Sequence, residues 1–302
     1  MEIYSAVSIY VVAHQDDWQL FMTPDAYNDL IDSDKKTVFI YTTAGDAGQD
    51  SVYWLAREKG ALRSVQYVLD THASPPAEPA YSHKSSAGHQ IQYCEYKNSG
   101  SYSLRLPDGR MTGKGSESYH EESITKLHKG HIESISAIDS STTYHGWQDL
   151  CDTLAAIIEA EAQGYGTVTL HSSDFLMLNN VVDNADHLTT GVATKAAVEK
   201  LGKKYAIRLY LDYDTDLLRP NLTPKQVLFK TGLFTAYDVT VQNEAGHCTH
   251  CETDYYLKWC LRQYSRLLGD RNIIRHLVYR IGTVIGHLSP WRRAEKGVTT
   301  GH

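Results

Sequence analysis

Near its start the chain carries the stretch Ser8-Ile9-Tyr10-Val11-Val12-Ala13-His14-Gln15-Asp16-Asp17. Its first half is a run of β-branched and aromatic residues, which is typical of a buried strand. Its second half places an imidazole and carboxylates where that strand should end, and open α/β sheets bind ligands at the carboxyl ends of their strands. Burying such groups is costly unless something offsets their desolvation. A divalent cation would do so, with His14 and Asp17 on the ion and Asp16 facing whatever the ion binds. The alternative is a solvated loop after a core strand.

Strand and helix patterns alternate along most of the chain. Apolar, β-branched runs recur between stretches whose apolar residues have helical spacing. Such alternation indicates an α/β fold with a mostly parallel sheet and helices on both of its faces. We expect one domain over residues 1–302. The expected strands cover 36–43, 89–96, 167–171 and 207–213, and the expected helices cover 51–69, 147–163 and 188–201.

Two stretches lack these patterns. Residues 73–88 are rich in Pro, Ser and Ala and are expected to form a loop. Residues 97–144 are rich in Gly, Ser, Thr and His, and they contain the turn signal Arg105-Leu106-Pro107-Asp108-Gly109. This second stretch is too long for a plain connection inside a compact domain. We therefore expect a lid or substrate-facing insertion over 97–144 within the single domain.

The composition narrows the class of protein. The 302 residues carry a formal net charge of -7, with 15 histidines counted as neutral, so no basic field is available to attract a nucleic acid. The 5 cysteines show no regular framework, which fits a reducing compartment. We find neither a signal-peptide pattern nor an apolar run of bilayer length. We expect a soluble, cytoplasmic protein without a transmembrane segment.

The stretch His14-Gln15-Asp16-Asp17 resembles the Ala-His-Pro-Asp-Asp signature of the LmbE-like, or PIG-L, family of zinc-dependent N-deacetylases. That family has a second signature, His-Pro-Asp-His at the start of a helix, and Asn184-Ala185-Asp186-His187 matches it in part. The chain departs from the two signatures at Gln15, in the proline position, and at Asn184, in the first histidine position. The resemblance implies a Rossmann-like fold and a catalytic metal, which is zinc or another divalent cation.

The resemblance also implies roles for the matching residues. His14, Asp17 and His187 would bind the zinc ion and leave a position open for water. Asp16 would act as the general base that takes the proton of that water. In the family, the helix expected over 51–69 carries an arginine toward the substrate. Arg57 is the nearest candidate, and a solvated helix arginine is an equally good interpretation of it.

The departure at Asn184 leaves the stabilisation of the oxyanion open. A protonated histidine at this position would donate to the oxyanion of the tetrahedral intermediate, whereas asparagine can donate only as an uncharged group. A nearby imidazole could take over, and His171 is the candidate because it ends the expected strand over 167–171. Asp186 would hold an imidazole or tune the charge near the site, or it would simply be a carboxylate in the first turn of a helix.

The reaction that follows is hydrolysis of an amide, with an N-acetylated amino sugar or sugar conjugate as the small-molecule substrate. Two alternatives remain at this stage. The chain could be a non-catalytic carbohydrate-binding protein on the same fold, with Asn184 as the lesion. It could also be a metal-dependent hydrolase that acts on an ester or a phosphoester.

Two further segments carry weaker signals. His247-Cys248-Thr249-His250-Cys251 could bind a separate zinc ion, but a structural site normally needs a second ligand pair, and the chain has no Cys-x-x-Cys partner for it. We therefore favour a packed loop at this cluster. In residues 272–288, apolar residues recur among basic ones, which suggests an amphipathic helix on the body of the protein or, as the alternative, on a partner or membrane surface.

Overall fold

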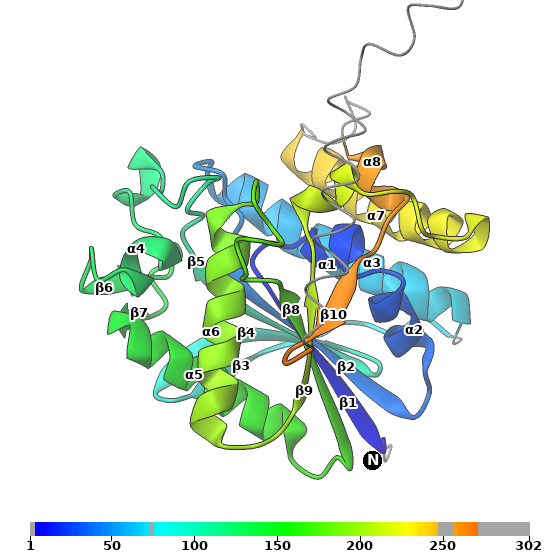
Figure 1. Cartoon of the computed structure of the whole chain (residues 1–302), viewed down its shortest axis with the longest axis horizontal. Coiled ribbons are helices and arrows are strands. Elements are labelled where there is room, and N and C mark those ends of the chain that lie inside the picture. The colour runs from blue at the N-terminus through cyan, green and yellow to red at the C-terminus, as the bar shows by residue number, and fades with distance from the viewer. Residues whose placement is uncertain (1–3, 73–74, 247–255, 271–302) are drawn as a thin grey trace, which may run out of the picture.

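The computed structural model describes residues 4–72, 75–246 and 256–270, and a large sheet lies at its centre (Figure 1). The strands of this sheet are β1 (Ala6–Val12), β2 (Lys35–Thr43), β3 (Ala80–Ser86), β4 (His89–Tyr96), β5 (Ser99–Leu106), β8 (Thr167–Ser173), β9 (Ala206–Tyr210) and β10 (Ser265–Leu267). They lie in the order β10-β9-β8-β1-β2-β5-β4-β3. Neighbours from β9 to β5 are parallel, whereas β10, β4 and β3 pair antiparallel. The predicted mostly parallel sheet is confirmed.

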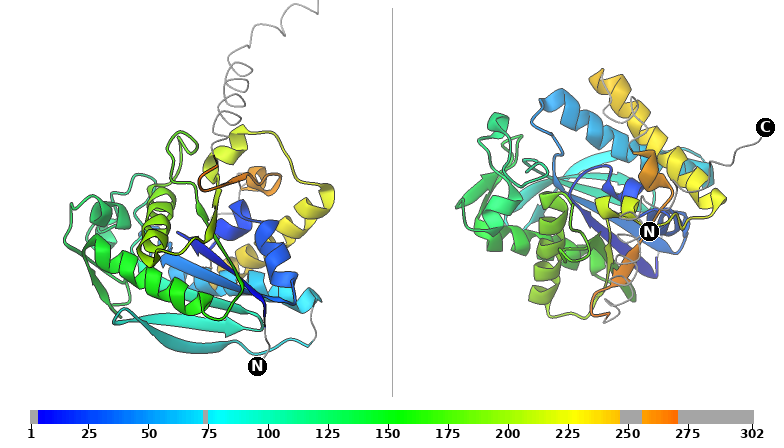
Figure 2. Two further views of the ribbon diagram at one scale, coloured as in Figure 1. Left: turned by 60° about the horizontal axis from the view of Figure 1, so that its bottom comes forward. Right: turned by 45° about the horizontal axis from the view of Figure 1, so that its top comes forward.

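Helices cover both faces of the sheet, as predicted (Figure 2). One face carries α5 (Gly146–Ala162) and α6 (Ala185–Leu201), and the other carries α1 (Asp17–Phe21), α2 (Asp25–Ile31), α3 (Ser51–His72) and α7 (Pro224–Ala245). A hydrophobic core lies between the sheet and the helices on each face. The central strand β1 contributes Ile9 and Val11 to the core under α5 and α6, and it contributes Tyr10 and Val12 to the core on the opposite face. A strand buried on both faces needs a continuous apolar run, and β1 has one.

Smaller elements complete the described part of the chain. A short helix α4 (Ile124–His128) and the paired strands β6 (Ser134–Ser136) and β7 (Thr143–His145) lie beside α5 and α6. The single-turn elements are η1 (Glu117–Tyr119), η2 (Tyr213–Leu217) and α8 (Leu257–Cys260). None of the described helices combines the length and the apolar character that a bilayer span requires.

Two expectations from the sequence need correction. Part of the predicted loop over 73–88 is the edge strand β3, whose residues are nearly all exposed, so it lacks the apolar alternation of a buried strand. The predicted insertion over 97–144 begins with β5, which lies inside the main sheet between β2 and β4. In β5 the buried Tyr102, Leu104 and Leu106 alternate with half-buried residues, but its serines and glycine resemble loop composition.

The packing of α6 on the end of β8 yields a test of the fold. Gly191 of α6 lies so close to the carbonyl oxygen of Ser173 that an added Cβ would overlap it. Gly191→Ala should therefore lower the free energy of unfolding by on the order of 1 kcal/mol, although alanine is the better helix former. Gly166→Ala is the control, because the nearest atom to its Cβ would be the Ser5 oxygen at 3.7 Å. Equal denaturation midpoints for the two variants would contradict this account of the packing.

Candidate active site and metal centre

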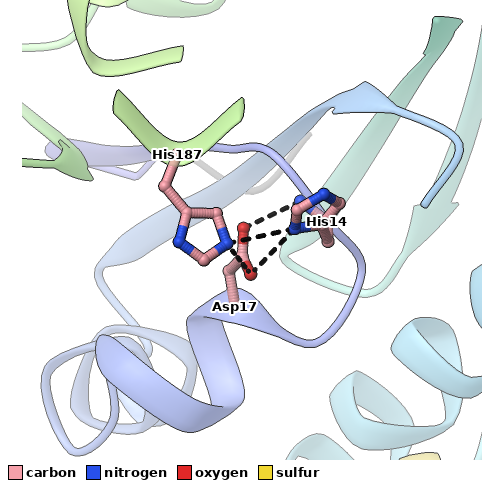
Figure 3. A group of neighbouring side chains, drawn as sticks. All are labelled: His14, Asp17 and His187. Atoms are coloured by element: carbon pink, nitrogen blue, oxygen red, sulfur yellow. Dashed lines mark hydrogen bonds and ion pairs between the residues drawn. The ribbon is translucent and has the colours of Figure 1, made fainter. Parts of the chain in front are cut away.

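Two distant segments meet at the carboxyl edge of the parallel strands. β1 ends at Val12, and the chain turns within four residues so that α1 begins at Asp17. The backbone N–H of His14 donates to Asp17 Oδ2 at 2.8 Å, and this bond fixes the turn. His187 enters from the first turn of α6, the helix that follows β8, the neighbour of β1. Figure 3 shows the three side chains pointing toward one another.

The ligand atoms of these side chains converge. His14 Nδ1 lies 3.1 Å from His187 Nε2, and Asp17 Oδ1 lies 3.1 Å from His187 Nε2 and 3.5 Å from His14 Nδ1. All three residues are buried, with exposed fractions of 5% for His14, 2% for Asp17 and 0% for His187. The donor set of two imidazoles and one carboxylate is one that zinc accepts.

The far nitrogen of each imidazole faces carboxylates. His187 Nδ1 lies 2.8 Å from Asp183 Oδ1 and 3.5 Å from Asp212 Oδ2. His14 Nε2 lies 3.6 Å from Asp186 Oδ2 and 3.8 Å from an oxygen of a further aspartate, residue 108. Carboxylates behind metal-binding histidines fix the orientation of the ring and make it a better ligand. The two imidazoles thus have the orientation and the outer carboxylates that metal-binding histidines need, with two carboxylates beside the far nitrogen of each ring.

The charges of this cluster favour a cation. Burial disfavours the charged imidazole, but Asp17 and the other carboxylates outweigh it and raise the pKa of His14 to about 10. The pKa of His187 is also raised, mainly by Asp17 and against its burial. Burial disfavours the Asp17 carboxylate, yet the two imidazoles hold the pKa of Asp17 well below its usual range. His14 Nδ1 and His187 Nε2 are 3.1 Å apart, so these two nitrogens cannot both carry a proton that points at the other. A single cation shared between the two nitrogens fits this distance better than two protons do.

Asp16 and Arg57 form a buried ion pair beside this cluster. A guanidinium nitrogen of Arg57 donates to Asp16 Oδ1. Arg57 Nε also donates to the Tyr237 hydroxyl at 2.7 Å, and Nη1 donates to the Gly45 carbonyl at 2.5 Å. Arg57 is only 6% exposed, so the interpretation of Arg57 as a solvated helix arginine is wrong. Through these bonds α3 and α7 hold the Asp16 carboxylate in one orientation.

A pocket of about 240 Å³ opens over the cluster. Its wall includes predicted site residues together with aromatic side chains and part of the chain after β5. The wall includes His14, Asp16, Asp17, Ala47, Tyr53, Arg57, Asp108, Arg110, Met111, Asn184, Tyr213 and Tyr256. The predicted substrate-facing insertion therefore supplies Asp108, Arg110 and Met111 to the pocket.

Asn184 caps the helix that carries His187. Its side-chain oxygen accepts a hydrogen bond of 2.9 Å from the backbone N–H of Asp186. The Asn184 side-chain oxygen is thereby committed, and its NH2 group is the part that can donate to a ligand. Asp186 accepts a 2.7 Å hydrogen bond from the Gly109 backbone N–H and faces His14, so it links the predicted insertion to the cluster.

His171 does not belong to this pocket. It lies in β8, which continues to Ser173, and its ring stacks on Tyr10 with centroids 4.1 Å apart. His171 Nδ1 lies 2.8 Å from the Tyr210 hydroxyl, in a separate polar cleft beside α2. Burial lowers the pKa of His171 to about 4, so the ring is neutral at neutral pH. The prediction that His171 stands in for the missing histidine near Asn184 is wrong, because strand alternation turns it to the face of Tyr10.

Of the outer carboxylates, Asp186 was predicted from the sequence, whereas Asp108, Asp183 and Asp212 were not. Asp212 lies just after the end of β9, where a strand end predicts a site residue, and Asp183 directly precedes the second motif at the start of α6. Asp108 belongs to a turn signal that was recognised without its role at the site. The predicted His247–Cys251 cluster and the predicted helix over 272–288 lie outside the described residues.

No protein-family model and no curated protein matches the sequence. Among solved structures, the zinc-inhibited form of teicoplanin deacetylase Orf2 is 12% identical, with 78% of this chain and 84% of that chain covered and a TM-score of 0.40. N,N'-diacetylchitobiose deacetylase from Pyrococcus horikoshii, complexed with its inhibitor MPG, is 12% identical, with 95% of this chain and 88% of that chain covered and a TM-score of 0.43. GalB, the 4-carboxy-2-hydroxymuconate hydratase from Pseudomonas putida KT2440, is 11% identical, with 99% of each chain covered and a TM-score of 0.37. Because these identities and TM-scores are low, the function has to be inferred from the chain's own residues.

Proposed function

We propose that this chain is a zinc-dependent N-deacetylase that removes an acetyl group from an N-acetylated amino sugar or sugar conjugate. One observation carries the proposal. Two imidazoles 173 residues apart in the sequence direct their near nitrogens to one point beside Asp17, and carboxylates stand behind both rings. His14, Asp17 and His187 would hold the ion. The resemblance of the two sequence motifs to the LmbE-like family supports the same assignment.

Each neighbouring side chain has a task in amide hydrolysis. A bound zinc ion would supply a water of lowered pKa and would polarise the acyl carbonyl. Asp16 accepts the proton of the attacking water and returns it to the leaving amine. Arg57 keeps the Asp16 carboxylate aimed into the pocket. The NH2 group of Asn184 donates a hydrogen bond to the oxyanion, and it does so without charge.

The sugar part of the proposal is supported by the pocket wall. Tyr53, Tyr213 and Tyr256 line the pocket, and aromatic faces of this kind provide apolar surface with a polar edge. A sugar ring presents both apolar C–H groups and hydroxyls, which suits such a wall.

An assay over a panel of N-acetylhexosamine conjugates tests the function directly. We expect free amine to be released, to stop when a chelator removes the metal, and to return when zinc is added. The departure at Asn184 gives a non-catalytic carbohydrate-binding protein as the second candidate, for which sugar would bind without release of amine. Chelator-sensitive cleavage of esters or phosphoesters alone would identify a different hydrolase.

The first prediction from the proposed function concerns the metal. His14→Ala and His187→Ala should each lose most of the roughly one equivalent of zinc that we expect in the wild type, because a three-ligand site with one ligand missing binds far more weakly. Metal analysis of the purified proteins measures this. His131→Ala removes an exposed histidine and is the matched control. If both site variants keep wild-type metal, the metal site is elsewhere, and the His247–Cys251 cluster becomes the first suspect.

The second prediction separates the base from the ligand. Asp16→Asn should keep its metal yet lose activity by on the order of a hundredfold or more, which is the usual worth of general-base assistance. Asp17→Asn should lose metal as well as activity. Zinc content and kcat, measured on the same preparations, distinguish the two variants. Similar metal loss in both would show that the roles are wrongly assigned.

The third prediction concerns the oxyanion donor. Asn184→His should add a new limb near the ordinary histidine pKa of about 6.5 to the pH profile of kcat/KM, because the donor then titrates. Asn184→Ala should reduce kcat by on the order of a hundredfold, as is typical when one such donor is lost. His171→Ala should leave the shape of the profile unchanged, since His171 lies outside the pocket. A profile of Asn184→His identical to that of the wild type would rule out a role for this position in the reaction.

A further inference from the structure

Arg110 is held at the rim of the pocket by its backbone. Its φ of 61° lies in the left-handed region, which is uncommon for a residue with a side chain. The Asp108 carboxylate accepts a 2.6 Å hydrogen bond from the Arg110 N–H, which offsets the strain of this conformation. The next residue, Met111, accepts a 3.2 Å hydrogen bond from the Ala185 N–H at the start of α6. These bonds hold the backbone around Arg110, and Arg110 lines the same pocket as Asn184, His14 and Asp17.

The guanidinium of Arg110 differs in its partners from that of Arg57, the other arginine of the pocket. Arg57 is buried and paired with Asp16. Arg110 is exposed and donates to the Ala47 carbonyl, and no carboxylate of the described residues forms an ion pair with it. The nearby Asp108 is already occupied, since its oxygens accept from the backbone N–H groups of Ala47 and Arg110. A guanidinium has five N–H donors, so most of those on Arg110 remain available to a ligand.

We propose that Arg110 is a specificity-determining residue that binds an anionic group, a carboxylate or a phosphate, of the N-acetylated substrate. This inference rests on the proposed deacetylase function and deepens it by naming the substrate class. A planar guanidinium matches carboxylate and phosphate oxygens with paired hydrogen bonds. The backbone of Arg110 is already held in place by the Asp108 carboxylate, which limits the conformational entropy lost when a ligand binds. The carboxylates around the metal cluster would repel an anion from the floor of the pocket. The anionic group therefore lies at the rim on Arg110, while the acetamide reaches the metal.

A purely structural role would have a different consequence. If Arg110 only ties the loop at Ala47 to the chain after β5, its loss would loosen the pocket and affect every substrate alike. If Arg110 binds an anion, its loss affects only substrates that carry one. Substrates matched in everything except charge therefore decide between the two roles.

The test uses the zinc-loaded wild type, Arg110→Gln and Lys114→Gln. Lys114 is exposed and does not line the pocket, so Lys114→Gln is a control for the loss of one positive charge nearby. The substrates are the methyl glycoside of N-acetylglucosamine and its 6-phosphate, and the methyl glycoside of N-acetylmuramic acid as the free carboxylate and as the neutral methyl ester. In the wild type we expect at least one anionic substrate to have the higher kcat/KM. Arg110→Gln should lower kcat/KM for that substrate by about tenfold to a hundredfold. The kcat/KM of Arg110→Gln for the neutral glycosides should be nearly unchanged, and so should the kcat/KM of Lys114→Gln for every substrate.

Binding gives a readout that does not depend on turnover. Calorimetry should show that glucosamine 6-phosphate or muramic acid binds the wild type more tightly than methyl glucosaminide, and that Arg110→Gln removes the difference. The proposal would be overturned if Arg110→Gln lost the same factor in affinity and kcat/KM for neutral and anionic compounds. It would also be overturned if the wild type showed no preference for the anionic compounds. If no compound is deacetylated by any protein, the deacetylase function fails, and the N-acetylated compounds are compared by binding. An anion preference that depends on Arg110 then still supports the anion site, and its absence refutes it.

Discussion

The structure depends on the arrangement of three buried ligand atoms at the end of β1. His14 Nδ1, His187 Nε2 and Asp17 Oδ1 lie 3.1 to 3.5 Å apart. The Asp17 carboxylate attracts positive charge on both imidazoles, which raises the pKa of His14 and of His187, but two positively charged rings at this distance would repel each other, and burial disfavours every charge in the cluster. A single cation bound by these three atoms would balance the charges, and the arrangement is one that could hold a metal ion. The outer carboxylates and the helix positions already hold the three side chains in place.

The position of β1 in the middle of the sheet makes this precision possible. β1 pairs with β2 on one side and with β8 on the other, and both of its faces are buried. A shift of its register by one residue would turn its side chains to the wrong cores, so the register is strongly specified. The residues after β1 therefore leave the sheet at a fixed point. The segment after β8 arrives at the neighbouring point, where α6 presents His187 in its first turn.

Local features of the site could be predicted from the sequence, and features that depend on tertiary position could not. His14, Asp16 and Asp17 follow a strand pattern within four residues, so their placement is nearly local. The position of His187 at the site was predicted from the partial match of Asn184-Ala185-Asp186-His187 to the second family motif. The placement of His171 at the site failed because the strand runs two residues further than expected, and the side-chain alternation of a strand then decides the face. Asp186 was predicted with the same motif, but Asp108, Asp183 and Asp212 lie in three separate segments, and no spacing rule connects those segments to the first motif.

The departure at Asn184 also has a structural meaning. Asparagine is among the preferred N-cap residues, and replacing such a cap typically costs about 1 kcal/mol of helix stability. Here the capped helix is α6, and the metal ligand His187 lies in its first turn, three residues after the cap. The Asn184 side-chain oxygen therefore steadies the turn of helix that carries His187, and Asn184 also lines the pocket. A histidine at this position would cap the helix less well. In the proposed reaction, asparagine would donate to the oxyanion only as an uncharged group, so more of the charge stabilisation would fall on the cation that His14, Asp17 and His187 would hold.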